Sequence, residues 1–337
     1  MRWYHGLLYI VLLSIGLGCG QALPSSVETE PPPVTGWQES TLPHDGLVRP
    51  FRYYLPERDA SKVAMPVIFL LHGGTGSADN VLRGGSLEWP LIAEEEQAIL
   101  ILPNGTDPVT GAPSGDELNW NDCRPQDDAP EAATTADDVG FIRQLIGWAE
   151  ENFSVDTDRV YATGASNGGM MSYRLAQELD DRIAAIAAFV ANEPAQSECR
   201  RPSRPVPVFI ANGTDDPLMP FRGGAIAFGG RGFVLSTGAT VAYWTQVHGI
   251  GELPLVEQLP DLDRADGSVP TRYRYGAAGP RGAPVEAYRI DGGGHLVPSI
   301  AHPVNSRPIQ GVSSRSNGDL EGARAAWAFL SRHRLSD

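Results

Sequence analysis

A serine between two glycines stands near the middle of the chain, in Gly164-Ala165-Ser166-Asn167-Gly168. In this G-x-S-x-G pattern the serine sits on a tight turn between a strand and a helix, where its hydroxyl can act as a nucleophile. The residues before it favour a strand, and those after it carry apolar side chains at helical spacing. A chain of this composition in random order would contain about 0.3 such patterns, so the pattern alone is weak evidence. The predicted strand before it and the predicted helix after it are what favour Ser166 as a nucleophile. The alternative is a glycine-rich turn whose serine only caps the helix.

A carboxylate that could support this serine lies further along, in Gly213-Thr214-Asp215-Asp216-Pro217. The segment follows the apolar strand predicted over residues 206–210. The carboxyl ends of such strands line the crevice where open α/β sheets bind ligands. An aspartate here could therefore face that crevice, and an Asx turn before the proline is the alternative.

The base that would activate Ser166 comes last. His295 ends the run Gly292-Gly293-Gly294-His295, after the strand predicted over residues 285–290. There it would take the proton from the serine, and the aspartate would fix the tautomer of its imidazole. A solvent-exposed loop histidine is the alternative, and His302 is the rival base. The chain order serine, aspartate, histidine is that of α/β-hydrolases, not of the chymotrypsin or subtilisin types.

Two backbone N–H groups would have to stabilise the oxyanion that forms during attack. One belongs to Asn167, directly after the nucleophile. The other is expected in Leu71-His72-Gly73-Gly74-Thr75-Gly76, the loop after the strand predicted over residues 67–71, and we choose Gly74. A phosphate-binding loop is excluded, because no Gly-Lys-Ser/Thr follows.

The elements that position these residues are strands alternating with helices. Continuous apolar runs at 67–71 and 99–102 are typical of strands buried on both faces. Further strands are predicted at 51–55, 160–162, 183–190, 206–210 and 285–290, and helical stripes at 91–96, 139–149, 171–179, 240–247 and 320–330. The alternation predicts an α/β fold, a mostly parallel sheet with helices on both faces, in one domain over residues 37–337.

Composition excludes several classes of function. The 337 residues carry a net charge of −15, which disfavours nucleic acid and anionic lipid as partners. Hydrophobic residues make up 42%, enough for a sizeable core. Only one basic residue is a lysine, Lys62, and the others are arginines. No motif calls for a metal or another cofactor.

The N-terminal residues have the character of an export signal. Residues 7–17 form an apolar run that is too short to span a bilayer. Cleavage after Ala22 fits a signal peptide over residues 1–22, and lipidation of Cys19 is the alternative. Residues 23–36, rich in proline, serine and threonine, are expected to be a flexible tether. The protein would then be extracellular or held at the cell envelope, with membrane contact only through a lipid on Cys19.

The sequence resembles the secreted polyhydroxybutyrate depolymerase and feruloyl esterase family of α/β-hydrolases. The similarity rests on the segment from Asp158 to Met170 around the serine and on matching motifs in the same order along about 260 residues. These motifs are Leu71-His72-Gly73, Trp120-Asn121, Asp137-Asp138-Val139-Gly140-Phe141, Gly213-Thr214-Asp215-Asp216-Pro217, Gly292-Gly293-Gly294-His295 and the late Trp327.

The resemblance implies a serine esterase that forms an acyl-enzyme with the triad Ser166, Asp216 and His295. It selects Asp216 over Asp215 through the pattern Gly-Thr-x-Asp-Pro. The implied substrates are small or oligomeric esters, namely hydroxyalkanoate oligomers and feruloyl or acetyl esters. The chain departs from the family's frequent His-Thr-Trp-Pro, having His295-Leu296-Val297-Pro298 instead. A prolyl-oligopeptidase-type peptidase and an inactive binding module are the alternatives.

Three further expectations concern the loops. Trp120 follows the strand at 99–102, where it could stack on an aromatic acyl group or pack beneath its loop. Cys123 and Cys199 both lie at the carboxyl edge of the sheet and could form a disulfide, which export would permit. Residues 190–206 are too short and proline-rich for a helical lid, so an open site is expected.

Overall fold

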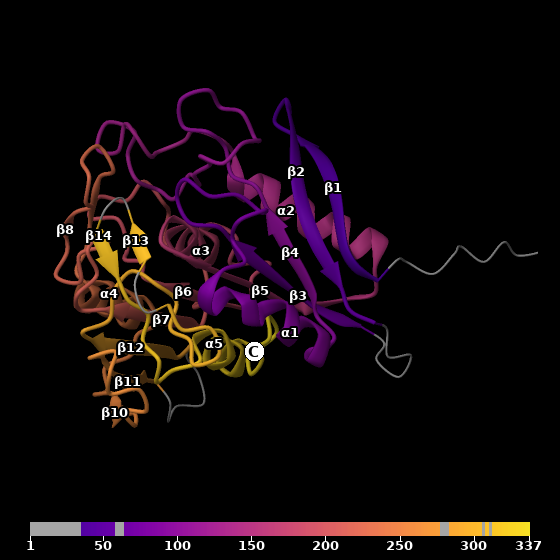
Figure 1. Ribbon diagram of the computed structural model, residues 1–337. Coiled ribbons are helices and arrows are strands. Elements are labelled where there is room, and N and C mark those ends of the chain that lie inside the picture. Colours follow the sequence, from indigo (N-terminus) through magenta and orange to yellow (C-terminus); the bar gives the residue numbers. More distant parts are fainter. Residues whose placement is uncertain (1–34, 58–63, 277–282, 305–306, 310–311) are drawn as a thin grey trace, which may run out of the picture. The chain divides into compact units, whose positions relative to one another are not determined.

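A ten-stranded sheet organises the chain in the computed structural model, which describes residues 35–57, 64–276, 283–304, 307–309 and 312–337. The predicted signal peptide, Cys19 and most of the predicted tether lie outside these ranges. The described residues belong to the unit Thr35–Asp337. Figure 1 shows the strands running side by side between helices.

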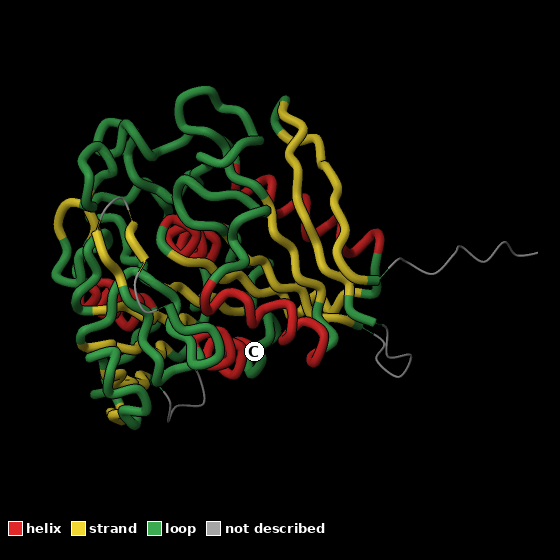
Figure 2. The backbone as a smooth tube through the Cα atoms, in the orientation of Figure 1, coloured by secondary structure: helices red, strands yellow, loops and turns green. Residues whose placement is uncertain are grey.

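The centre of the sheet is parallel, as predicted. Six neighbouring strands run in the order β4 (Ile99–Pro103), β3 (Met65–Leu71), β5 (Val155–Ala165), β6 (Ala185–Phe189), β7 (Val208–Gly213) and β12 (Val285–Asp291). Antiparallel strands complete the sheet at both edges. Beyond β4 lie β2 (Leu47–Leu55) and then β1 (Gly36–His44). Beyond β12 lie β11 (Val269–Tyr275) and then β10 (Leu255–Gln258). The loops that follow the parallel strands gather at one edge (Figure 2).

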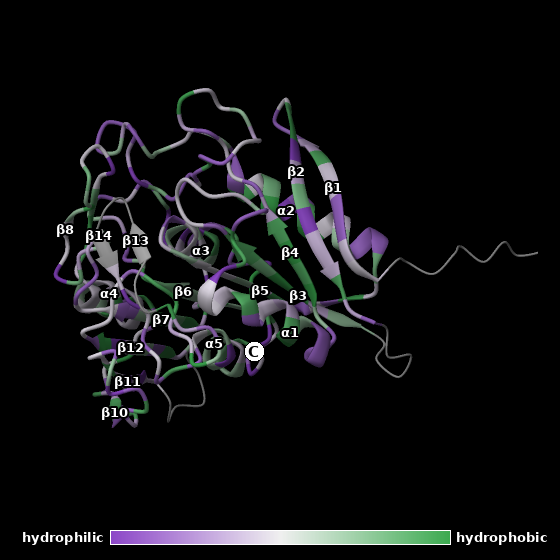
Figure 3. Cartoon of the chain, viewed as in Figure 1, coloured by the Kyte–Doolittle hydropathy of each residue, from purple (hydrophilic) through white to green (hydrophobic). Residues whose placement is uncertain are grey.

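Helices cover both faces because the strand side chains alternate between them. One face of the sheet packs with α2 (Asp138–Asn152), α3 (Asn167–Glu178) and α4 (Thr237–Val247). The other packs with α1 (Glu88–Glu96), which the short 3₁₀ helix Gly84–Leu87 precedes, and with α5 (Gly322–Leu330). Strands β3 and β4 are hydrophobic along their length in Figure 3, which fits burial on both faces.

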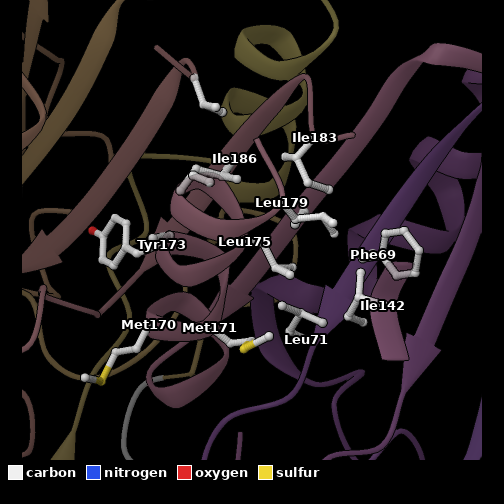
Figure 4. Packing of buried hydrophobic residues seen from close by; sticks show 14 of the residues in the cluster. Phe69, Leu71, Ile142, Met170, Met171, Tyr173, Leu175, Leu179, Ile183 and Ile186 are labelled. Atoms are coloured by element: carbon white, nitrogen blue, oxygen red, sulfur yellow. The ribbon is translucent and has the colours of Figure 1, made fainter. Parts of the chain in front are cut away.

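Helix α3, which begins directly after the candidate nucleophile, is held by its apolar stripe. Met171, Leu175 and Leu179 are fully buried and lie in the same cluster as Phe69 and Leu71 of β3. Figure 4 shows these side chains meeting between the helix and the strand. Because the stripe fixes the helix against the sheet, the turn between β5 and α3 has a defined position.

The sequence analysis missed several elements. Apart from the buried Pro270, the side chains of strands β1, β10 and β11 are exposed or half-buried, and β10 is exposed throughout. None of the three therefore has the apolar run that marks the central strands. Strand β5 is also longer than predicted, and β7 begins later and reaches Gly213. Two small strand pairs lie outside the main sheet: β8 (Gly224–Ala225) with β9 (Phe233–Val234), and β13 (Arg307–Ile309) with β14 (Val312–Ser314).

Candidate active site

Ser166 occupies a strained turn between β5 and α3. Its φ of 58° and ψ of −125° are unusual for a residue with a side chain. The flanking glycines allow the strand and helix to meet there. A Cβ on Gly164 would lie 2.6 Å from the carbonyl carbon of Gly168, and one on Gly168 would lie 2.3 Å from the oxygen of Leu71. This geometry is that of a nucleophile elbow.

His295 and Asp216 meet at the same edge of the sheet. The imidazole Nδ1 lies 2.7 Å from Oδ2 of Asp216, and only 8% of the histidine side chain is exposed. The other carboxylate oxygen accepts hydrogen bonds from the N–H groups of Leu218 and Met219, both at 2.8 Å. The carboxylate is therefore fixed in place, and since it only accepts hydrogen bonds, Nδ1 carries the proton.

Asp215 points away from this pair. Its side chain is exposed and accepts a hydrogen bond from the hydroxyl of Thr214. The rival histidine, His302, instead contacts Glu88 through Nε2 at 3.2 Å. The geometry therefore favours Asp216 over Asp215 and His295 over His302.

Strand order explains how residues so distant in sequence come together. Asp216 follows β7 and His295 follows β12, and these strands are parallel neighbours. The two loops touch so closely that a Cβ on Gly213 would lie 2.1 Å from the oxygen of Gly293. The hydroxyl of Ser314 accepts the N–H of His295 at 2.6 Å, which holds the histidine loop from its other side.

Ser166 and His295 both line one cavity of about 340 Å³. Much of its wall is apolar, including Trp89, Phe189 and Met219. Leu296 and Val297, where the resembled family often has threonine and tryptophan, also line it. The cavity is large enough for an organic ligand of modest size.

The loop after β3 lies beside the elbow. A Cβ on Gly74 would lie 3.5 Å from Cβ of Asn167, so the two residues are in close contact. Within the described residues, no acceptor takes the N–H of Gly74. Asn167 begins α3, where the first N–H groups have no acceptor within the helix. Both groups lie at the wall of the cavity that contains Ser166.

A buried histidine holds this loop. His72 donates from Nδ1 to the carbonyl of Gly73 at 2.8 Å and accepts the N–H of Gly105 at Nε2, at 3.0 Å. Burial lowers the pKa of His72 to about 4, so the ring is neutral and its tautomer is fixed. The sequence analysis quoted His72 only as part of a motif and did not assign it this role.

Trp120 lies beneath its loop and not in the cavity wall. It is fully buried, packs against the His72 ring at 4.7 Å and donates from its indole Nε1 to the His72 carbonyl at 2.9 Å. It cannot stack on an acyl group from this position. Of the two roles considered, packing is therefore the one that the structure has.

The side chain of Asn167 connects the elbow to the Trp120 loop. Its Oδ1 accepts the N–H of Trp120 at 2.7 Å, and its Nδ2 donates to the Trp120 carbonyl and to Asp122. Asp122 in turn forms a buried ion pair with Arg124 at 2.7 Å. Nothing in the sequence pattern marked these contacts, because they join residues about 45 positions apart.

A second buried ion pair supports the same loop. Asp138 contacts Arg49 at 2.6 Å and accepts the N–H of Asn121 at 2.8 Å. Burial raises the pKa of Asp138, while the positive charge of Arg49 lowers it. The Trp120-Asn121 motif and the Asp137-Asp138 motif are therefore parts of one packed unit.

Cys123 and Cys199 form a disulfide, with their Cα atoms 5.3 Å apart. It joins the loop after β4 to the loop after β6. The latter loop contains no helix, as predicted.

Part of the cavity wall comes from residues 214–236 between β7 and α4, which we call the covering segment. Leu218, Met219, Ile226 and Arg231 from it line the cavity. The segment is anchored where the N–H of Ala195 donates to the carbonyl of Phe233 at 2.9 Å. This part of the wall was not predicted, because the segment has no apolar period.

The described residues show no other obvious functional centre. No helix among them has the length and apolar character needed to cross a membrane. They also contain no cluster of three or more histidine, cysteine or acidic side chains arranged to hold a metal.

Comparison with known proteins gives consistent matches. A family model described as phospholipase/carboxylesterase matches residues 58–228, about half of the chain. "Putative esterase NocK" of Nocardia uniformis subsp. tsuyamanensis is 30% identical over 294 residues, which cover 85% of this chain and 80% of that protein. "Probable feruloyl esterase C" of Aspergillus niger is 32% identical over 161 residues, or 47% of this chain and 51% of that protein.

A solved structure also shares the fold. Acetyl xylan esterase from Aspergillus awamori aligns with a TM-score of 0.52 over 78% of this chain and 95% of that one, at 15% identity. The described strands and helices therefore form an α/β-hydrolase fold, as the sequence analysis predicted.

Proposed function

Since the chain belongs to the phospholipase/carboxylesterase family of α/β-hydrolases and is a carboxylic ester hydrolase, we propose that it works through Ser166, His295 and Asp216 by way of an acyl-enzyme. The observation that carries the proposal is the 2.7 Å contact between His295 Nδ1 and Asp216, with Ser166 at the wall of the same cavity as the histidine. In acylation, Nε2 of His295 takes the proton of the Ser166 hydroxyl as its oxygen attacks the ester carbonyl carbon.

The tetrahedral intermediate then needs its negative charge stabilised. We assign this role to the N–H groups of Gly74 and Asn167, supported by their contact beside Ser166. When the intermediate collapses, the alcohol leaves with the proton from His295, and the acyl group stays on the serine. Water, activated by the same histidine, then releases the acid. Asp216 keeps the proton on Nδ1 and stabilises the imidazolium in both steps.

The proposed substrates are short acyl esters such as acetyl esters, hydroxyalkanoate oligomers, and aromatic esters such as feruloyl esters. A cavity of about 340 Å³ with a largely apolar wall supports this choice, as do the relatives described as feruloyl esterases. The chain spans about half the length of the feruloyl esterase C relative.

We also propose that the protein is exported. The apolar run near the N-terminus and the disulfide between Cys123 and Cys199 support this, since such bonds persist in oxidising compartments. Cleavage after Ala22 and lipidation of Cys19 are the two routes. The mass of the N-terminal peptide from the exported protein distinguishes them.

A substrate panel tests the proposed reaction. Rates are compared on p-nitrophenyl acetate and butyrate, methyl ferulate, acetylated xylan and hydroxybutyrate oligomers, with a p-nitroanilide as the amide control. Hydrolysis of at least one ester group, lost in Ser166→Ala, is the expected result. Turnover of the amide alone, or activity that persists in Ser166→Ala, would reject the proposal.

A further inference from the structure

The cavity that contains Ser166 is lined by cations and by no carboxylate. Arg83, Arg124 and Arg231 contribute to its wall, and no aspartate or glutamate of the described residues does. This is unusual for a chain with a net charge of −15. A wall of this sign attracts an anion.

Two of the three guanidinium groups have partners in the protein. Arg124 is buried and pairs with Asp122 through both Nε and Nη2. Arg83 donates to Oδ1 of Asn80 at 3.3 Å. Their charges are therefore at least partly engaged before any ligand arrives.

Arg231 differs from both. Its guanidinium forms no hydrogen bond or ion pair with any residue in the described ranges. Glu131 and Glu117 act on it through their charges without a hydrogen bond, and Glu131 lies beside the neighbouring Gly230. Burial lowers the pKa of Arg231 and the neighbouring Arg124 lowers it further, while Glu131 and Glu117 raise it. Such a group is costly to keep in place unless something pairs with it.

The position of Arg231 is nevertheless well defined. Its backbone carbonyl accepts a hydrogen bond from the guanidinium of Arg124, and the N–H of Ile226 bonds to the carbonyl of Gly232 at 2.9 Å. Arg231 lines the same cavity as three apolar residues of the covering segment, Leu218, Met219 and Ile226. A carboxylate placed there would form a charge-assisted, partly desolvated pair.

We propose that Arg231 determines specificity by pairing with a carboxylate on the substrate, so that the preferred esters are anionic ones that carry a free carboxylate near the scissile bond. This inference rests on the proposed function, because it places the carboxylate in the cavity of Ser166. The carboxylate belongs either to the acyl part or to the alcohol part of the ester, and the two arms of the test separate these cases.

Two matched pairs of esters test the proposal. p-Nitrophenyl hydrogen adipate and its neutral methyl ester carry or lack a carboxylate on the acyl side. 3-Acetoxybenzoate carries a carboxylate on the alcohol side of its ester, and methyl 3-acetoxybenzoate lacks it. In at least one pair, we expect the wild-type kcat/KM to favour the anion. In Arg231→Gln, kcat/KM for the anionic ester should fall about tenfold, mainly because KM rises. For the neutral ester, kcat/KM should stay within about twofold of wild type.

Arg222→Gln is the matched control. Arg222 lies in the same covering segment but is exposed and outside the cavity wall, so its loss removes the same charge without removing the contact. The anion preference should survive in this variant and should weaken further in Arg231→Glu. Absence of any anion preference in both pairs, or a preference that persists in Arg231→Gln, would overturn the inference. Failure of the wild type to hydrolyse any of the four esters would instead count against the proposed function.

Discussion

His295 Nδ1 lies 2.7 Å from Oδ2 of Asp216, although 79 positions separate the two residues. The contact exists because β7 and β12 are parallel neighbours whose carboxyl ends meet. The adjacent carboxylate, Asp215, is exposed and contacts Thr214 instead. Two neighbouring aspartates therefore have distinct environments, and they should behave differently when changed.

We expect Asp216→Asn to lower kcat by about 10³-fold or more, because an amide at this position leaves the imidazole without its carboxylate and disturbs its tautomer. Asp215→Asn, the matched control, should stay within about threefold of wild type. Steady-state rates on p-nitrophenyl acetate measure both. If Asp215→Asn were the more damaging change, the assignment of the acid would be wrong.

Trp120→Phe should leave substrate preference unchanged, since Trp120 is buried beneath its loop. The variant loses the hydrogen bond to the His72 carbonyl, which should lower the free energy of unfolding by about 1–2 kcal/mol. The KM ratio of methyl ferulate to p-nitrophenyl acetate, with urea unfolding, tests both statements. A selective rise in KM for the ferulate would show that the tryptophan contacts the acyl group.

Stability should fall as the pH is lowered from about 6.5 to 4. Burial lowers the pKa of His72, His248 and His333 to about 4, so the unfolded chain binds more protons than the folded one in this interval. Stability from these groups is present above pH 6.5 and is lost as the pH falls. Urea unfolding at several pH values measures it. In His72→Gln the pH slope should be shallower, and an unchanged slope would contradict the neutral, buried state of His72.

The disulfide should be intact in exported protein and should stabilise it. Cys123 and Cys199 are 76 positions apart, and closing such a loop is worth about 4.5 kcal/mol in the chain-entropy model. Mass spectrometry without reduction should show the linked peptides. The Cys123→Ala/Cys199→Ala double variant should unfold at lower urea concentration, and two free thiols in the exported wild type would refute the bridge.

How much could be predicted from the sequence depended on whether a pattern was local. The apolar run of β3 and the turn around Ser166 are local, so the sheet core and the elbow were predictable. Strand β10 is exposed throughout and leaves no such pattern, so the antiparallel edge was missed. The role of Arg231 was equally hidden, because it depends on which side chains the covering segment brings to the cavity.

The same distinction applies to the packing around the site. Asn167 was chosen for its backbone N–H, but its side chain also bonds to both backbone groups of Trp120. Such contacts arise only when β4, β5 and their loops are assembled. The choice of Asp216 over Asp215 required the family's Gly-Thr-x-Asp-Pro pattern, because the strand alone allows either aspartate to face the crevice.

The most direct test of the account is covalent labelling by a fluorophosphonate, with the site mapped by mass spectrometry. The tryptic peptide of residues 160–174 contains Ser166 and one other serine, Ser172, which is buried and donates to the carbonyl of Gly168. The account predicts one adduct per chain, on Ser166, with labelling slowed by at least about a hundredfold in His295→Ala. An adduct on any other residue, or labelling that proceeds undiminished in Ser166→Ala, would contradict it.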